Sequence, residues 1–120
     1  YPIDREAGGR SALVKTIDLL NQNHIVVIYP EGTRSRDGKL KDFKTGVVLL
    51  QEKTQCPIVP VAIQGAFEIW PANKSWPKWG RVSLRVGQLI YPSTPAEDLP
   101  YQQAQVERSQ ELKNHLSLLL

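Results

Sequence analysis

The sequence has 120 residues, and 41% of them are hydrophobic, which suits one globular domain with a core of its own. No apolar run approaches the roughly 20 residues that cross a bilayer, so we expect no membrane-spanning segment here. A single cysteine excludes an internal disulfide framework. The net charge of +3 mildly favours anionic partners, which include phospholipid surfaces, nucleotide-bearing thioesters and nucleic acids.

The chain starts at Tyr1 and holds no methionine, so we expect it to be a fragment of a longer protein. A short extended piece ends in Asp4 and Arg5, which on their own suggest an ion pair that fixes a loop. After a glycine-containing turn, apolar residues recur at helical spacing from residue 11 to about residue 21. This pattern predicts an amphipathic helix packed on a sheet.

Residues 25–29 form an uninterrupted apolar, β-branched run that is typical of a strand buried on both faces of a parallel sheet. Pro30 ends this strand because proline has no amide hydrogen for the ladder. The polar loop 31–36 follows directly. In open α/β sheets ligands bind beyond the carboxyl ends of the strands, so we expect a site at this loop.

The residues after Pro30 have the chemistry of an anion site. Five cations lie on this one connection against three acids, and the arginine fork matches a phosphate bidentately. Thr33 and Ser35 add hydroxyl donors. The alternative is a solvated turn in which Glu31 pairs with Arg34 or Arg36.

A second helix is predicted from residue 45 to about residue 53, and its N-terminus could assist anion binding beside Arg34. The alternative is that Thr45 is a simple cap residue. Residues 58–63 form a second apolar strand, interrupted by Pro60, and Gly65 closes it at its carboxyl end. That end is expected near the 31–36 loop.

All three tryptophans lie in the connection 67–80, together with two lysines. Tryptophan interleaved with lysine is typical of a segment at a lipid headgroup boundary. Partly buried packing is the alternative. Nucleic-acid bases also stack on such rings, but no groove of phosphate contacts accompanies them, so we expect no nucleic-acid partner.

The remaining sequence alternates polar and apolar residues over 81–87, which predicts a half-exposed edge strand. Residues 94–97 have a capping-box pattern. A terminal helix is predicted over 101–120, with Leu112, Leu116 and Leu119 on one face. The fold class expected from these elements is α/β, with a mixed, mostly parallel sheet flanked by helices.

Three blocks resemble the glycerolipid acyltransferases related to 1-acylglycerol-3-phosphate acyltransferase. Residues 30–35, PEGTRS, followed by FKTG at 43–46, closely resemble the third block of this family. Residues 2–5 resemble the end of the second block, and residues 58–65 resemble the fourth. The resemblance implies that residues 1–92 belong to an acyltransferase domain and that 93–120 are a helical segment of the same domain.

The resemblance also implies a reaction and a site. A fatty acyl group would move from acyl-CoA or acyl carrier protein to 1-acylglycerol 3-phosphate, which gives phosphatidic acid. Arg5 and Arg34 would hold the acceptor phosphate, Glu31 would orient Arg34 or an acceptor hydroxyl, and Gly32 would let the backbone approach the ligand. Thr33 completes the substrate-binding set. No metal or other cofactor is implied.

One family block has no counterpart in these residues. The family's first block is a His and an Asp separated by four residues, but His24 and His115 are followed five positions on by Tyr29 and Leu120. We therefore expect the catalytic pair upstream, and this chain alone to turn over poorly or not at all. The alternatives are a non-catalytic phosphate- or lipid-binding relative and an enzyme acting on glycerol 3-phosphate or another lysophospholipid. We also expect peripheral attachment to the cytoplasmic side of a membrane.

Overall fold

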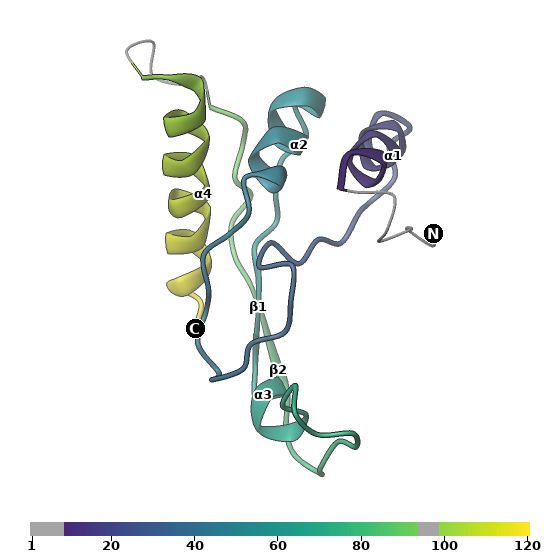
Figure 1. Ribbon diagram of the computed structural model, residues 1–120, viewed down its shortest axis with the longest axis vertical. Coiled ribbons are helices and arrows are strands. Elements are labelled where there is room, and N and C mark those ends of the chain that lie inside the picture. The colour runs from purple at the N-terminus through teal and green to yellow at the C-terminus, as the bar shows by residue number, and fades with distance from the viewer. Residues whose placement is uncertain (1–8, 94–98) are drawn as a thin grey trace.

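The computed structural model describes residues 9–93 and 99–120. These form an elongated body of 48 × 32 × 25 Å, with three longer helices at one end and two strands running toward the other (Figure 1). In chain order the elements are α1 (Gly9–Asn21), α2 (Gly46–Thr54), β1 (Val61–Gln64), α3 (Ala66–Ile69), β2 (Ser83–Val86) and α4 (Tyr101–Ser117).

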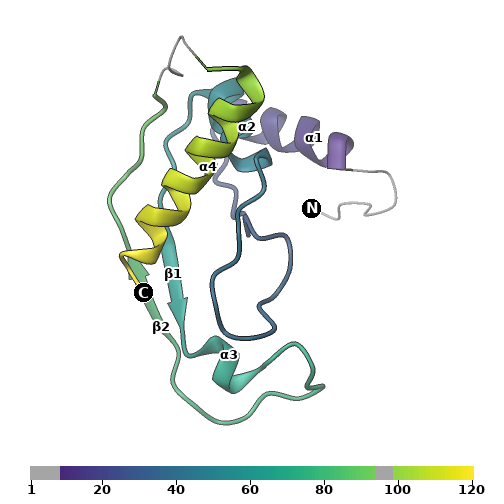
Figure 2. The same cartoon turned by 60° about the vertical axis from the view of Figure 1, so that its left-hand side comes forward.

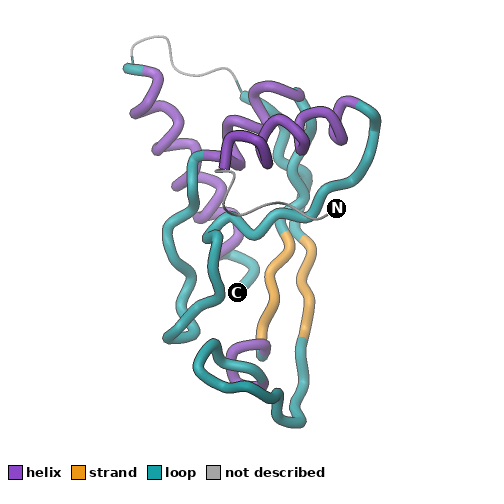
Figure 3. The backbone as a smooth tube through the Cα atoms, turned by 45° about the vertical axis from the view of Figure 1, so that its right-hand side comes forward, coloured by secondary structure: helices purple, strands orange, loops and turns teal. Residues whose placement is uncertain are grey.

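The strands β1 and β2 pair antiparallel, with Val61 opposite Val86 and Gln64 opposite Ser83 (Figure 3). An isolated bridge between Ile58 and Ile90 continues the pairing beyond the strands. Pro60 has no amide hydrogen, so it interrupts the ladder between this bridge and β1. The predicted strand over 81–87 is confirmed as β2, whereas the strand predicted over 58–63 forms regular structure only from Val61.

The mostly parallel sheet expected from the sequence is not observed in residues 9–93 and 99–120, where the only sheet is the antiparallel pair. Residues 25–29 have no regular structure, and Ile25 is 96% exposed rather than buried. A strand needs a neighbour to receive its backbone hydrogen bonds. No described segment lies beside residues 25–29 in that role, so all of these side chains except the partly buried Val26 are exposed.

The three predicted longer helices are confirmed as α1, α2 and α4. The core contains Val48 and Leu50 of α2, Ala62 of β1, and Ala104 and Leu112 of α4, and α4 packs on both α2 and β1. Figure 2 shows α4 lying along the strands with α2 behind its N-terminal half. The predicted capping box at 94–97 lies outside the described residues. Among the helices that are described, none is long and apolar enough to cross a bilayer.

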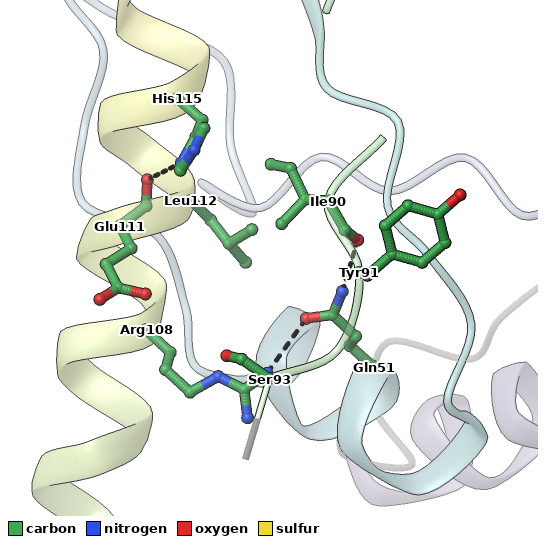
Figure 4. A pocket seen from close by; sticks show the side chains of 8 residues that line it. All are labelled: Gln51, Ile90, Tyr91, Ser93, Arg108, Glu111, Leu112 and His115. Carbon is green, nitrogen blue, oxygen red and sulfur yellow. Dashed lines mark hydrogen bonds between the residues drawn. The ribbon is translucent and has the colours of Figure 1, made fainter. Parts of the chain in front are cut away.

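A buried polar network joins α2 to α4. Arg108 donates to Glu52 at 3.0 Å and to the amide oxygen of Gln51 at 3.3 Å. Gln51 in turn donates to the carbonyl of Ile90 at 2.9 Å. A cavity of about 30 Å³ beside this network has room for a water or two, not for a lipid (Figure 4). We therefore assign the network to stability.

Replacing Arg108 by alanine should destabilise the chain strongly. The Arg108 and Glu52 side chains are only 10% and 16% exposed, so the change leaves a nearly buried carboxylate without its cation. We expect a loss of about 3 kcal/mol in the free energy of unfolding, measured by urea denaturation.

The matched control is Lys113→Ala, which removes a cation from the same helix. Lys113 pairs with Asp42, whose side chain is 88% exposed, so solvent screens that pair. Equal losses in the two variants would contradict the structural role of the Arg108 network.

Candidate functional site

A tight turn opens the loop that contains the predicted site residues. The amide of Gly32 donates to the carbonyl of Tyr29 at 2.9 Å, with Pro30 at the second position of the turn, where its fixed φ is favoured. Gly32 itself has φ +71°, and a Cβ there would lie 2.9 Å from the Lys44 side chain. The positive φ favours glycine at this position, whereas the flexible end of the Lys44 side chain could move aside for a Cβ.

Two hydrogen bonds close the loop on itself. The amide of Lys44 donates to the carbonyl of Pro30 at 2.9 Å, and the amide of Lys41 donates to a carboxylate oxygen of Glu31 at 2.9 Å. Within the described part of the chain, no ion pair joins Glu31 to Arg34 or Arg36. Glu31 therefore braces the base of the loop, and the structure does not bring its carboxylate to the Arg34 guanidinium.

Arg34 lies over the ring of Trp70, with its guanidinium carbon 5.4 Å from the ring centroid. The indole N–H of Trp70 donates to the carbonyl of Lys74 at 2.9 Å, which fixes the ring. A cation over a tryptophan face is attracted by the ring quadrupole. Arg34 is thus an exposed cation held on a defined surface, as an anion site requires.

Trp70 was not among the site residues that the sequence predicted. It follows Arg34 by 36 positions, and no local pattern links the two residues. The available signal was that the loop after residue 29 and the connection after residue 65 were both expected at one end of the molecule. The two segments also approach each other at a second place, because a Cβ at Gly38 in the loop would lie 3.0 Å from Phe67 in the connection.

The other predicted residues contribute less to the described geometry. Thr33 is exposed, and Arg5 lies outside the described residues. Thr45 precedes α2 but makes no side-chain capping hydrogen bond, so the simple-cap alternative is not observed. The start of α2 directly follows Lys44, whose amide closes the loop. Assistance from this helix N-terminus in anion binding stays a prediction.

The tip of the loop is ordered by Asp37. One of its carboxylate oxygens accepts hydrogen bonds from the Lys39 amide and the Ser35 hydroxyl, both at 3.1 Å. The Lys39 amide first, and then the Ser35 hydroxyl, hold the pKa of Asp37 below its usual 3.8. Asp42 ties the loop to α4 through Lys113 at 2.7 Å, and this contact lowers the pKa of Asp42 as well.

Replacing Ser35 by alanine should raise the pKa of Asp37 while leaving it below 3.8, because the Lys39 amide remains. Carboxyl-carbon NMR titration measures this pKa, and Asp42 in the same spectrum is the control that should not move. Folding lowers the pKa of Asp37, so its stabilising contribution is complete above about 3.8 and is lost as the pH falls through the lowered value. An unchanged pKa of Asp37 would contradict the assigned turn.

Comparison with known proteins relates this chain to acyltransferases. A family model described as Acyltransferase matches residues 1–64. A 1-acyl-sn-glycerol-3-phosphate acyltransferase of Bacillus subtilis is 32% identical over 126 residues, which cover 99% of this chain and 60% of that protein. A chloroplastic enzyme of the same name from Brassica napus is 39% identical over 82 residues, which cover 68% of this chain and 24% of that protein.

A solved structure shares the arrangement. The crystal structure of the 1-acyl-sn-glycerophosphate acyltransferase PlsC from Thermotoga maritima superposes with a TM-score of 0.71 at 28% identity. The match covers 90% of this chain and 44% of that structure. The chain thus spans about 60% or less of the length of these relatives. The match over residues 1–64, which contains the loop after Pro30, shows that the chain belongs to the acyltransferase family.

Proposed function

We propose that this chain is part of an enzyme that moves a fatty acyl group from acyl-CoA or acyl carrier protein to 1-acylglycerol 3-phosphate, with phosphatidic acid as the product. One observation carries the proposal: the loop closed between Pro30 and Lys44 holds Arg34 exposed on the Trp70 ring. The acceptor named for the Bacillus and Thermotoga relatives has a phosphate that such a cation would bind.

The reaction divides the work between two kinds of residue. The acceptor hydroxyl loses its proton to a base as its oxygen attacks the thioester carbonyl; an ester C–O bond forms, the C–S bond breaks and the thiol leaves. A His oriented by an Asp would be that base. These 120 residues contain no such pair at the family spacing. In this proposal the described residues would bind the acceptor, through Arg34 and the loop that presents it.

The remaining assignments extend this proposal. Arg5 would join Arg34 on the acceptor phosphate, and Thr33 would donate a hydroxyl hydrogen bond to it. Gly32 would let the backbone approach the ligand. The reaction needs no metal or cofactor besides the acyl thioester. A lysophosphatidate-like acceptor is a membrane lipid, so we place the reaction at the membrane surface, on its cytoplasmic side, with this segment peripheral.

A second candidate function is a binding module without catalysis. In this alternative the same loop binds a phosphorylated lipid and no acyl group is transferred. Both functions need the same phosphate site, and so does a related enzyme that acylates glycerol 3-phosphate.

Titrating the chain with glycerol 3-phosphate, short-chain lysophosphatidate and monoacylglycerol separates the acceptors. The proposal predicts that lysophosphatidate binds most tightly and that phosphate-free monoacylglycerol binds least.

Replacing Arg34 by lysine should weaken binding of short-chain lysophosphatidate about tenfold. The charge is kept, but a compact ammonium cannot replace a bidentate fork, and one charge-assisted hydrogen bond contributes about 1.5 kcal/mol or more. Isothermal titration calorimetry measures the affinity. Arg36→Lys makes the same change in the same loop and should have little effect, and equal affinities of wild type and Arg34→Lys would overturn the phosphate assignment.

Replacing Trp70 by leucine should weaken the same binding by about two- to fivefold, because a cation–π contact at an exposed site contributes about 0.5–1 kcal/mol. Trp70→Phe keeps a ring under Arg34 and should restore part of the loss. Trp79→Leu removes a tryptophan of the same connection that Arg34 does not contact, and serves as control. If Trp70→Leu binds as the wild type does, the ring does not position Arg34.

A further inference from the structure

The connection between α3 and β2 projects from the end of the molecule farthest from α1, along its longest axis (Figure 1). We call residues 70–81 the tryptophan lobe. Trp76 is 83% exposed and Trp79 is fully exposed. A tryptophan side chain buries about 150–250 Å² when it is packed. The lobe therefore presents two large apolar surfaces that contribute nothing to the core.

The three tryptophans of the lobe differ in their surroundings. Trp70 has its face under Arg34 and its indole N–H bonded to the carbonyl of Lys74. Among residues 9–93 and 99–120, no hydrogen bond or ring contact involves Trp76 or Trp79. The inner tryptophan has a partner in the fold, and the two outer ones lie in solvent.

Several contacts hold the base of the lobe in place. The amide of Lys78 donates to the carbonyl of Ile69 at 2.8 Å, across the lobe. A Cβ at Gly80 would lie 2.6 Å from Ile69, and one at Gly65 would lie 2.2 Å from the Arg81 carbonyl. The chain is thus closely packed where the lobe leaves and rejoins the body. Trp76 and Trp79 are carried on an anchored projection.

The charge of the lobe decides what kind of partner fits it. Lys74, Lys78 and Arg81 lie in the lobe, and it holds no acidic residue. The chain has 15 basic and 12 acidic side chains, so these three cations equal its whole net charge of +3. Outside the lobe the charges balance. Like charge would oppose a second copy docking through the same patch, and an anionic partner would be attracted.

We infer that the tryptophan lobe docks on an anionic lipid surface. Trp76 and Trp79 would enter the headgroup region, where the amphipathic indole is favoured, while Lys74, Lys78 and Arg81 lie near the lipid phosphates. Each cation near such a surface strengthens binding about fivefold, so three cations give roughly a hundredfold. This inference deepens the proposed function by naming the docking residues, and it would place Arg34, against Trp70, beside the lipid headgroups.

Vesicle binding tests the lobe directly with the complete 120-residue chain. The chain should bind vesicles of phosphatidylcholine mixed with phosphatidylglycerol, bind phosphatidylcholine alone far more weakly, and lose binding as salt increases. In a Trp70→Phe background, tryptophan fluorescence should shift to the blue and be quenched by brominated lipid, because only Trp76 and Trp79 then report.

Two double variants and two matched controls separate the contributions. The double variant Trp76→Ser with Trp79→Ser removes apolar area that would be buried at the interface, and it should weaken vesicle binding tenfold or more. The double variant Lys74→Gln with Lys78→Gln removes two cations near the lipid phosphates, and it should also weaken binding tenfold or more. Ile25→Ser with Val27→Ser removes exposed apolar residues elsewhere. Arg10→Gln with Lys53→Gln removes the same charge from exposed positions outside the lobe. Both controls should bind as the unsubstituted chain does.

Three results would overturn the inference. Equal losses in the lobe variants and the controls would mean that binding is not located at the lobe. Tighter binding to single-stranded RNA than to vesicles, lost in the same lobe variants, would make the partner a nucleic acid. Self-association lost in the lobe variants, without vesicle binding, would make it a second copy. Binding of soluble glycerol 3-phosphate does not need Trp76 or Trp79, so its persistence in the variants of those two residues separates a failed lobe from a failed phosphate site.

Discussion

The hydrogen bond from the Lys44 amide to the Pro30 carbonyl is the constraint on which the site depends. It joins the two ends of a long polar loop. Closing such a loop costs conformational entropy, and this hydrogen bond offsets part of that cost. The turn at Gly32 makes the closure possible because the backbone takes φ +71° there, a conformation that glycine adopts without strain. The residues between Pro30 and Lys44 therefore form one closed loop, and α2 begins shortly after Lys44.

The closed loop is attached to the body at separate points. Asp42 reaches Lys113 on α4, Gly38 packs near Phe67 of α3, and Arg34 lies on Trp70. The first of these attachments comes from an element that the core fixes, since α4 packs on α2 and β1. The polar network around Arg108 therefore supports the site indirectly, by setting the position of α4 against α2.

Sequence reasoning succeeded where the information is local. Helical spacing of apolar residues located α1, α2 and α4, and Pro30 located the start of the polar loop. It failed for residues 25–29, because a strand is defined by its neighbour and apolar content alone supplies none. It also missed the partners of the site residues. Glu31 accepts a hydrogen bond from a backbone amide, which no side-chain pattern shows. Trp70 contacts Arg34 from a distant part of the chain.

The connection after β1 combines structure and surface in one short segment. Trp70 has a cation on its face and a carbonyl on its N–H, so the fold explains it. Trp76 and Trp79 keep their apolar area in water, at a cost that the fold does not recover. A contact with an interface that is apolar on one side and anionic on the other would offset that cost and use the three cations as well. Arg34 lies on the ring of Trp70, and Trp70 is the first residue of this lobe. Binding of a lipid surface and binding of a lipid phosphate would therefore take place at the same end of the molecule.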